Sequence, residues 1–144
     1  MTLAHARDAA FEPSVALRFA RYWWIAGWML VAFITVSCLE PPRYVPDLHV
    51  SDKLEHAGAF FCLTLWFGGL VRRQRYPLLG LWMLLFGAGI ELAQGVMGWG
   101  RDMDFWDFAA DAIGVAVASG GLYVGLGMWT WQIERILGLS CEPS

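Results

Sequence analysis

Ionisable and amide side chains recur at three places in a chain that is otherwise strongly apolar. The three groups are Lys53 with His56, Glu91 with Gln94, and Arg101 with Asp104, Asp107 and Asp111. Carboxylates beside an imidazole can transfer protons, and lysine or arginine can bind an anion such as phosphate. These eight residues are therefore the candidates for a binding or catalytic site.

Two of the carboxyl groups, those of Glu91 and Asp111, are expected to lie deepest. Glu91 falls near the end of one apolar segment and Asp111 near the start of the next. Each should lie about 7–9 Å inside its helix at 1.5 Å per residue. In antiparallel neighbours the two groups would face each other, and one of them would hold a proton. The candidates for offsetting the remaining charge are Lys53, His56 and Arg101.

The composition indicates a membrane protein. The chain has 144 residues, enough for one domain, and is 58% hydrophobic and 16% charged. Its mean hydropathy is +0.48, and soluble domains are typically about 25% charged. No basic face or RNA-binding signature is present, so nucleic acid is not an expected partner. The expected partner is the lipid bilayer.

Four apolar segments are long enough to cross a bilayer. We expect transmembrane helices at 22–39, 54–71, 77–97 and 106–129, which form an all-α bundle with short loops. Pro77 stands at the start of the third, where its missing N–H costs least. This membrane domain, 22–131, would lie between an N-terminal arm, 1–21, and a tail, 132–144.

The arginines predict the orientation of the bundle. Seven of the ten lysines and arginines fall in the two terminal segments and the second loop. They are Arg7, Arg18, Arg21, Arg72, Arg73, Arg75 and Arg135. Because basic loops stay cytoplasmic, both termini are expected in the cytoplasm of a cell with an inner membrane, and the polar groups at its outer face. A cleavable signal ending near "VSC" (36–38) is the alternative, and it would place the N-terminus outside.

Small residues and cysteines add two expectations. Ala110, Gly114 and Ala118 recur every four residues, which lets helix backbones approach closely. Cys38, Cys62 and Cys141 have neither metal-ligand nor redox spacing and are expected as thiols. Histidine with carboxylates can hold a metal ion, but the spacing matches no known closed site. No metal or other cofactor is predicted.

The polar motifs together resemble the VanZ-like family of small bacterial membrane proteins. They are Asp52-Lys53-x-x-His56, Glu91-x-x-Gln94, and Arg101-x-x-Asp104-x-x-Asp107-x-x-x-Asp111-x-x-Gly114. The resemblance covers residues 50–118. It implies an integral protein of the bacterial cell envelope, in a family whose namesake is associated with resistance to the glycopeptide teicoplanin. The family often has asparagine at the position of Asp111.

Three functions from different classes are open to such a site. The first is binding of a lipid-linked or cell-wall-related ligand, or of another membrane protein, through Lys53 and Arg101. The second is an intramembrane enzyme that acts on a lipid-linked substrate, with Glu91 or Asp111 as acid or base and His56 as their partner. The third is a proton-coupled carrier. It would need a homo-oligomer, because four short helices leave little room for a transport path across the membrane. A purely structural role is the fourth alternative.

Overall fold

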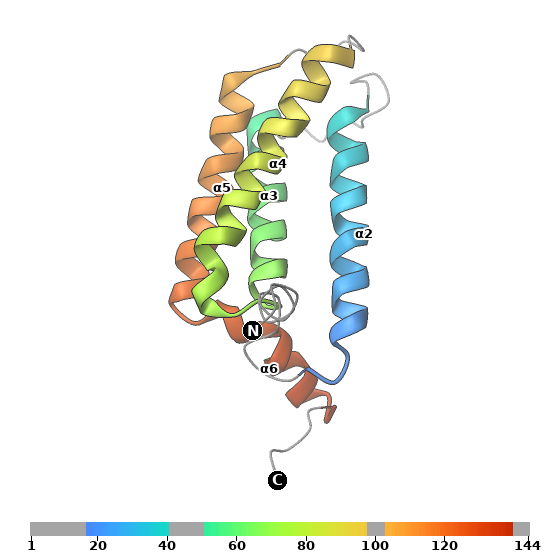
Figure 1. The fold of residues 1–144 in the computed structure, drawn as a ribbon, viewed down its shortest axis with the longest axis vertical. Coiled ribbons are helices and arrows are strands. Elements are labelled where there is room, and N and C mark those ends of the chain that lie inside the picture. Colours follow the sequence, from blue (N-terminus) through green and yellow to red (C-terminus); the bar gives the residue numbers. More distant parts are fainter. Residues whose placement is uncertain (1–16, 41–50, 98–102, 140–144) are drawn as a thin grey trace, which may run out of the picture.

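The chain folds into helices throughout the part that the structure, a computed structural model, describes, which is residues 17–40, 51–97 and 103–139. Four long helices lie beside one another, and a short fifth helix lies at one end (Figure 1). The long helices are α2 (Ala20–Leu39), α3 (Asp52–Gly68), α4 (Tyr76–Met97) and α5 (Phe105–Tyr123), and the short one is α6 (Trp129–Ile136). Single 3-10 turns, η2 (Arg73–Arg75) and η3 (Leu126–Met128), precede α4 and α6. The predicted all-helical class is confirmed.

Local sequence signals account for the helix starts. The side chain of Ser51 accepts a hydrogen bond from the Leu54 amide and caps α3, whose first turn is acidic. Asp104 caps α5 in the same way through the Trp106 amide. Polar caps and early carboxylates stabilise a helix N-terminus because its first amides have no partner within the helix. The predicted starts therefore lie within two residues of those observed.

The last predicted helix, 106–129, is broken. Helix α5 ends at Tyr123, and α6 leaves its direction by 81°. Between them Gly125 has φ 124°, a conformation that glycine adopts without the steric cost other residues meet. The segment expected to begin a tail at 132 instead lies inside α6. The second predicted helix, 54–71, also ends earlier, at Gly68.

Two segments are long and apolar enough to cross a membrane, Ala20–Leu39 and Arg73–Met97. The bent pair of α5 and α6 makes a third if it counts as one span. Helix α3 is not among them, since it has 17 residues and opens with charged side chains. The described helices thus supply two or three candidate spans, where the sequence predicts four.

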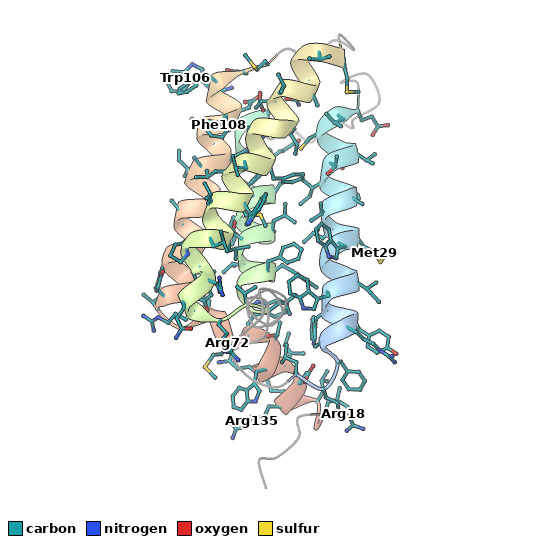
Figure 2. All side chains as sticks on the ribbon, in the orientation of Figure 1. Arg18, Met29, Arg72, Trp106, Phe108 and Arg135 are labelled. Atoms are coloured by element: carbon teal, nitrogen blue, oxygen red, sulfur yellow. The ribbon has the colours of Figure 1, made fainter. Side chains whose placement is uncertain are left out.

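The surface of the bundle is apolar and several charged groups lie inside it. Met29 of α2 is 67% exposed and points away from the other helices (Figure 2). Leu85 of α4 and Ile113 of α5 are likewise exposed. Ionisable residues within membrane segments almost always face the bundle interior. This distribution is what a protein surrounded by lipid requires.

Helix α3 is central and packs most extensively against α5. The contact is close because small residues line α5: Ala110, Gly114 and Ala118 are all buried. A Cβ atom at Gly114 would overlap the carbonyl oxygen of Ala57 on α3. The predicted role of these small residues is therefore confirmed on α5.

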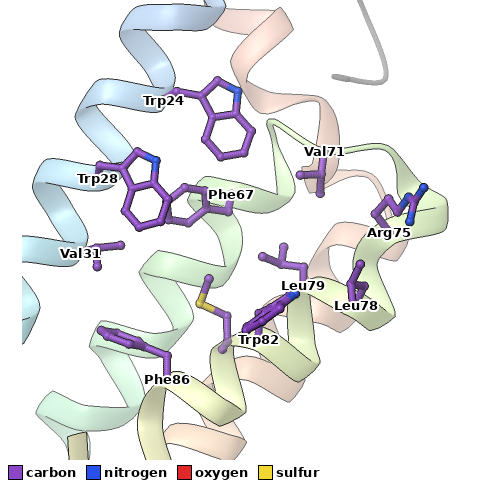
Figure 3. A pocket seen from close by; sticks show the side chains of 11 residues that line it. Trp24, Trp28, Val31, Phe67, Val71, Arg75, Leu78, Leu79, Trp82 and Phe86 are labelled. Atoms are coloured by element: carbon purple, nitrogen blue, oxygen red, sulfur yellow. The ribbon is translucent and has the colours of Figure 1, made fainter. Parts of the chain in front are cut away.

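Helix α2 packs less tightly and encloses a cavity. Trp24 and Trp28 of α2, Phe67 of α3, and Trp82 of α4 line a space of about 360 Å³ between these helices (Figure 3). Its lining is apolar apart from Arg75. The cavity lies toward the end of the bundle that carries α6, so it is separate from the polar side chains described below.

The two ends of the bundle differ in charge. Every arginine in the described ranges lies at the end where α2 and α4 begin; they are Arg18, Arg21, Arg72, Arg73, Arg75 and Arg135. Figure 2 labels three of them there, and Trp106 at the far end. A buried carboxylate also lies at the arginine-rich end. Glu134 of α6 accepts hydrogen bonds from the Arg18 and Phe19 amides and from the Trp23 indole, at 2.8, 3.1 and 2.9 Å.

Glu134 therefore fixes the two residues just before α2 from a distant part of the chain. A carboxylate is favourable at a helix N-terminus because the unpaired amides and the helix dipole attract negative charge. Cys38 and Cys62 are not joined in a disulfide, and Cys141 lies outside the described residues.

Candidate functional site

A cluster of polar side chains occupies the end of the bundle where α3 and α5 begin and α4 ends. We call it the polar cluster: Asp52, Lys53, His56, Glu91, Gln94, Asp104, Asp107 and Asp111. His56, Glu91, Gln94, Asp107 and Asp111 are buried, with 0–5% of each exposed. Seven of the eight residues singled out from the sequence thus lie together. The eighth, Arg101, lies outside the described residues.

His56 and Asp111 form a buried pair between α3 and α5. Nδ1 of His56 is hydrogen-bonded to Oδ1 of Asp111 at 2.9 Å. An ionised carboxylate can only accept, so Nδ1 then carries the proton and Nε2 is the basic nitrogen. A carboxylate on one ring nitrogen fixes the orientation and the tautomer of an imidazole.

Gly87 of α4 makes room for this pair. A Cβ at position 87 would lie 2.7 Å from Oδ2 of Asp111 and 3.3 Å from the Phe60 ring. Any larger residue there would push the carboxylate away from its present position. Phe60 also stacks on Phe86, with the ring centroids 5.7 Å apart. The base of the polar cluster is therefore apolar and closed.

Glu91 lies beside the pair without sharing a hydrogen bond with Asp111. One oxygen of each carboxyl and one nitrogen of His56 all lie within 4.8 Å of one another. Oε2 of Glu91 accepts from the Asp104 amide at 2.9 Å. The predicted arrangement, two carboxyls that face each other across one proton, is thus replaced by a group of three in which the imidazole is the partner of Asp111.

Lys53 bridges two carboxylates at the mouth of the cluster. Its Nζ donates to Oδ2 of Asp104 at 3.0 Å and to Oδ1 of Asp107 at 2.9 Å. Half of the lysine side chain is exposed. The hydrogen bond from the Trp106 amide, and then the one from Lys53, hold the pKa of Asp104 below its usual range. Lys53 therefore offsets these two aspartates and not Glu91 or Asp111.

Gln94 joins two helices at the edge of the polar cluster. Its Nε2 donates to the carbonyl oxygen of Cys38 at 2.9 Å, which ties the end of α4 to the end of α2. Amide side chains commonly join helices in this way inside membranes. We therefore assign Gln94 a mainly structural contact at the edge of the cluster.

Four buried atoms in the cluster have no hydrogen-bond partner: Nε2 of His56, Oε1 of Glu91, Oε1 of Gln94 and Oδ2 of Asp111. A buried polar atom without a partner is costly and rare. His56, Glu91 and Asp111 come from three different helices and each brings one potential ligand atom within 4.8 Å of the others, which is what a site for a proton, an ion or a ligand group needs.

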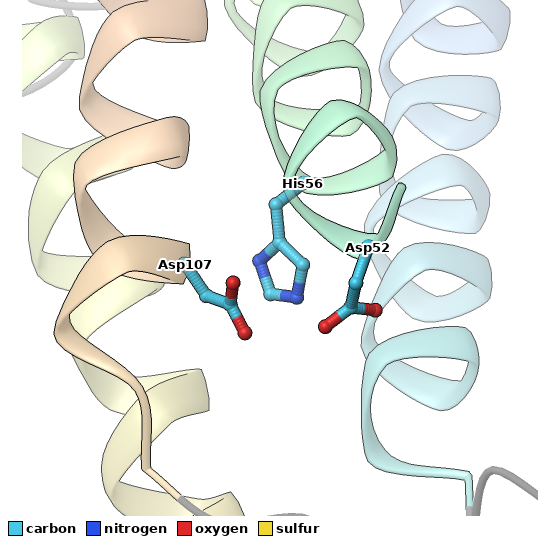
Figure 4. A group of neighbouring side chains, drawn as sticks. All are labelled: Asp52, His56 and Asp107. Carbon is cyan, nitrogen blue, oxygen red and sulfur yellow. The ribbon is translucent and has the colours of Figure 1, made fainter. Parts of the chain in front are cut away.

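One residue of the cluster was missed among the site candidates. Asp52 lies one turn before His56 on α3, and Figure 4 shows Asp52 and Asp107 on the two sides of the imidazole. One potential ligand atom of each of the three lies within 4.8 Å of the others. The i, i+4 spacing of Asp52 and His56 was the available signal, because such residues share a helix face.

Comparison with known proteins adds no identification. No family model, no curated protein and no solved structure matches this chain.

Proposed function

We propose that the chain is a VanZ-like integral membrane protein of the cell envelope that binds a lipid-linked or cell-wall-related ligand at its outer face. Its four long helices would all cross the membrane. Helix α3, at 17 residues, has a length of about 25 Å, the lower limit for a span. Contacts with α2, α4 and α5 surround it, so its charged residues need not face lipid.

The distribution of charge supports the orientation. The described arginines lie at one end of the bundle and the polar cluster at the other. Basic segments stay in the cytoplasm, so the polar cluster would face outward and both termini inward. The sharp bend before α6 suits a short helix that lies along the cytoplasmic surface.

One observation carries the ligand-binding proposal: a half-exposed lysine stands above buried polar atoms that have no partner. Lys53 can exchange one of its two carboxylates for a phosphate oxygen, because an ammonium group has three donors. The resemblance to VanZ-like proteins extends the proposal to glycopeptide resistance. The proposed binding site consists of residues from α3, α4 and α5 that are distant in sequence and adjacent in space.

A second function is favoured by the His56–Asp111 pair. A histidine oriented by a carboxylate and with Nε2 free is the arrangement of a general base. In an enzyme, His56 would take a proton from water and Asp111 would stabilise the imidazolium. Glu91 would be the nearby acid, and the substrate would be a lipid-linked ester or phosphoester.

Binding of a polyprenyl phosphate tests the proposal. The full chain in nanodiscs would be titrated with this probe, and Lys53→Ala compared with the control Glu55→Gln, which changes an exposed residue of the same helix turn. We expect binding by the wild type and the control, and at least tenfold weaker binding by Lys53→Ala. Equal binding by both variants would contradict the proposal. Release of product from the probe, lost in His56→Ala, would favour the enzyme.

A further inference from the structure

Nε2 of His56 is a buried nitrogen atom that has no hydrogen-bond partner. Only 2% of the residue is exposed. Nδ1 is already bonded to Asp111. When the imidazole is neutral, the hydrogen bond to Asp111 leaves the lone pair on Nε2, in the interior of the protein.

Two carboxylates flank this ring. Asp52 precedes His56 by one turn of α3, and Asp107 approaches from α5 (Figure 4). One potential ligand atom from each of these three residues lies within 4.8 Å of the others. Two donors on one ion, each at about 2.0–2.2 Å, lie no more than about 4.4 Å apart. The limit of 4.8 Å on their separations is thus close to the separation that a shared ion requires.

Asp111 binds the other ring nitrogen of His56. A histidine that binds a metal ion commonly donates its other N–H to a carboxylate, which orients the ring and makes it more basic. The Asp111–His56 hydrogen bond has this geometry and need not change when an ion binds. Asp107 likewise has a second oxygen, so it can reach an ion while Oδ1 accepts from Lys53.

Carboxyl groups outnumber basic groups in the described part of this end. There are seven carboxyl groups and two basic side chains, Lys53 and His56; the carboxyl groups are Glu40, Asp52, Glu55, Glu91, Asp104, Asp107 and Asp111. Three of the seven, Glu91, Asp107 and Asp111, are buried, and Lys53 binds only Asp107 of these three. Negative charge that is buried without compensation is strongly destabilising.

We propose that Nε2 of His56 and the carboxylates of Asp52 and Asp107 bind one divalent transition-metal ion of the Zn²⁺ or Mn²⁺ type. One imidazole with two carboxylates suits such an ion better than Mg²⁺ or Ca²⁺, which prefer oxygen alone. Three protein ligands leave coordination positions open. The ion would thus give the ligand site proposed above a direct contact for phosphate, and only this last step rests on that proposed function.

Metal titration of the full, tag-free chain in detergent, without lipid, tests the site. Zn²⁺ binding would be followed by calorimetry and Mn²⁺ binding by electron paramagnetic resonance, after treatment with a chelator. We expect one ion per chain. Asp52→Asn should weaken binding at least tenfold, and the matched control Glu55→Gln, on the same exposed turn of α3, should leave it unchanged.

Two buried variants extend the test. His56→Ala should abolish binding, and Asp111→Asn should weaken it about 10–100-fold, the usual effect of losing an orienting partner. Circular dichroism would show that each variant keeps its helices, and Asp52→Asn changes an exposed side chain. Absence of binding by the wild type would overturn the inference. So would equal losses in Asp52→Asn and Glu55→Gln, or a loss confined to Glu91→Gln.

The two proposals fail separately. If metal does not bind but polyprenyl phosphate does, the metal site is wrong and the ligand site stands. If metal binds with the expected variant pattern but polyprenyl phosphate does not, the ion is correctly assigned and the ligand is not.

Discussion

Replacement of Gly114 by alanine should separate α3 from α5. The added Cβ would overlap the Ala57 carbonyl oxygen, which belongs to the backbone and cannot rotate away. The matched control is Gly120→Ala on the same helix, where the added Cβ would have no neighbour within 4 Å. Both changes gain the same helix propensity, about 0.5–1 kcal/mol, since alanine loses less backbone entropy than glycine.

The difference between the two variants therefore isolates the packing clash. Forcing an extra carbon into a closely packed contact typically costs about 1–3 kcal/mol. We expect Gly114→Ala to be less stable than Gly120→Ala by this amount, and Gly120→Ala to be at least as stable as the wild type. The free energy of unfolding would be measured by circular dichroism as sodium dodecyl sulfate is added to protein in mild detergent. Equal stability of the two variants would refute the close approach of α3 and α5.

Three more predictions concern single contacts. Glu134→Ala should destabilise the chain by about 1–3 kcal/mol because the Arg18 and Phe19 amides and the Trp23 indole lose their acceptor, and Gln132→Ala, on the exposed face of α6, should change the free energy of unfolding little. Gly87→Ala should displace the Asp111 carboxylate and weaken metal binding up to about 100-fold in the same titration, whereas Gly89→Ala, with open space around it, should leave binding unchanged. Because folding lowers the pKa of Asp104, its contribution is present above its ordinary value of 3.8 and lost as pH falls below it. Unfolding at pH 5 and pH 3 should therefore show a smaller pH effect in Asp104→Asn.

The apolar runs predicted the helices well because burial in lipid or in the bundle determines where such runs can lie. The position of the polar cluster could also be predicted. Antiparallel helices bring the start of one beside the end of the next, so Lys53, Glu91 and Asp107 had to meet at one end.

The pairing inside the cluster could not be predicted in the same way. It depends on how far each helix is rotated about its axis, and the close packing at Gly114 sets that rotation for α5. The rotation turned Asp111 toward His56 instead of Glu91, and it placed Lys53 between Asp104 and Asp107. Sequence spacing limits these partners and does not choose among them.

The break after Tyr123 was missed for another reason. The apolar run continues through 124–131, and glycines are common in membrane helices, so Gly125 gave no clear signal of a turn. Glu134 was missed because its backbone partners, the Arg18 and Phe19 amides just before α2, are more than a hundred residues away. The amphipathic pattern of 129–136 was the only local sign of α6.

The central claim is that the polar cluster is a functional site at the outer face and more than a structural contact. Cells that lack the native protein, complemented with Glu91→Gln, Asp111→Asn or the control Glu55→Gln, test it most directly. Membrane immunoblots would measure protein level, and growth with glycopeptides and detergents would measure envelope function. We predict normal accumulation of all three variants, with function lost in the first two and kept in the control. Full function in the first two variants at normal protein levels would contradict the claim, and so would their disappearance from the membrane.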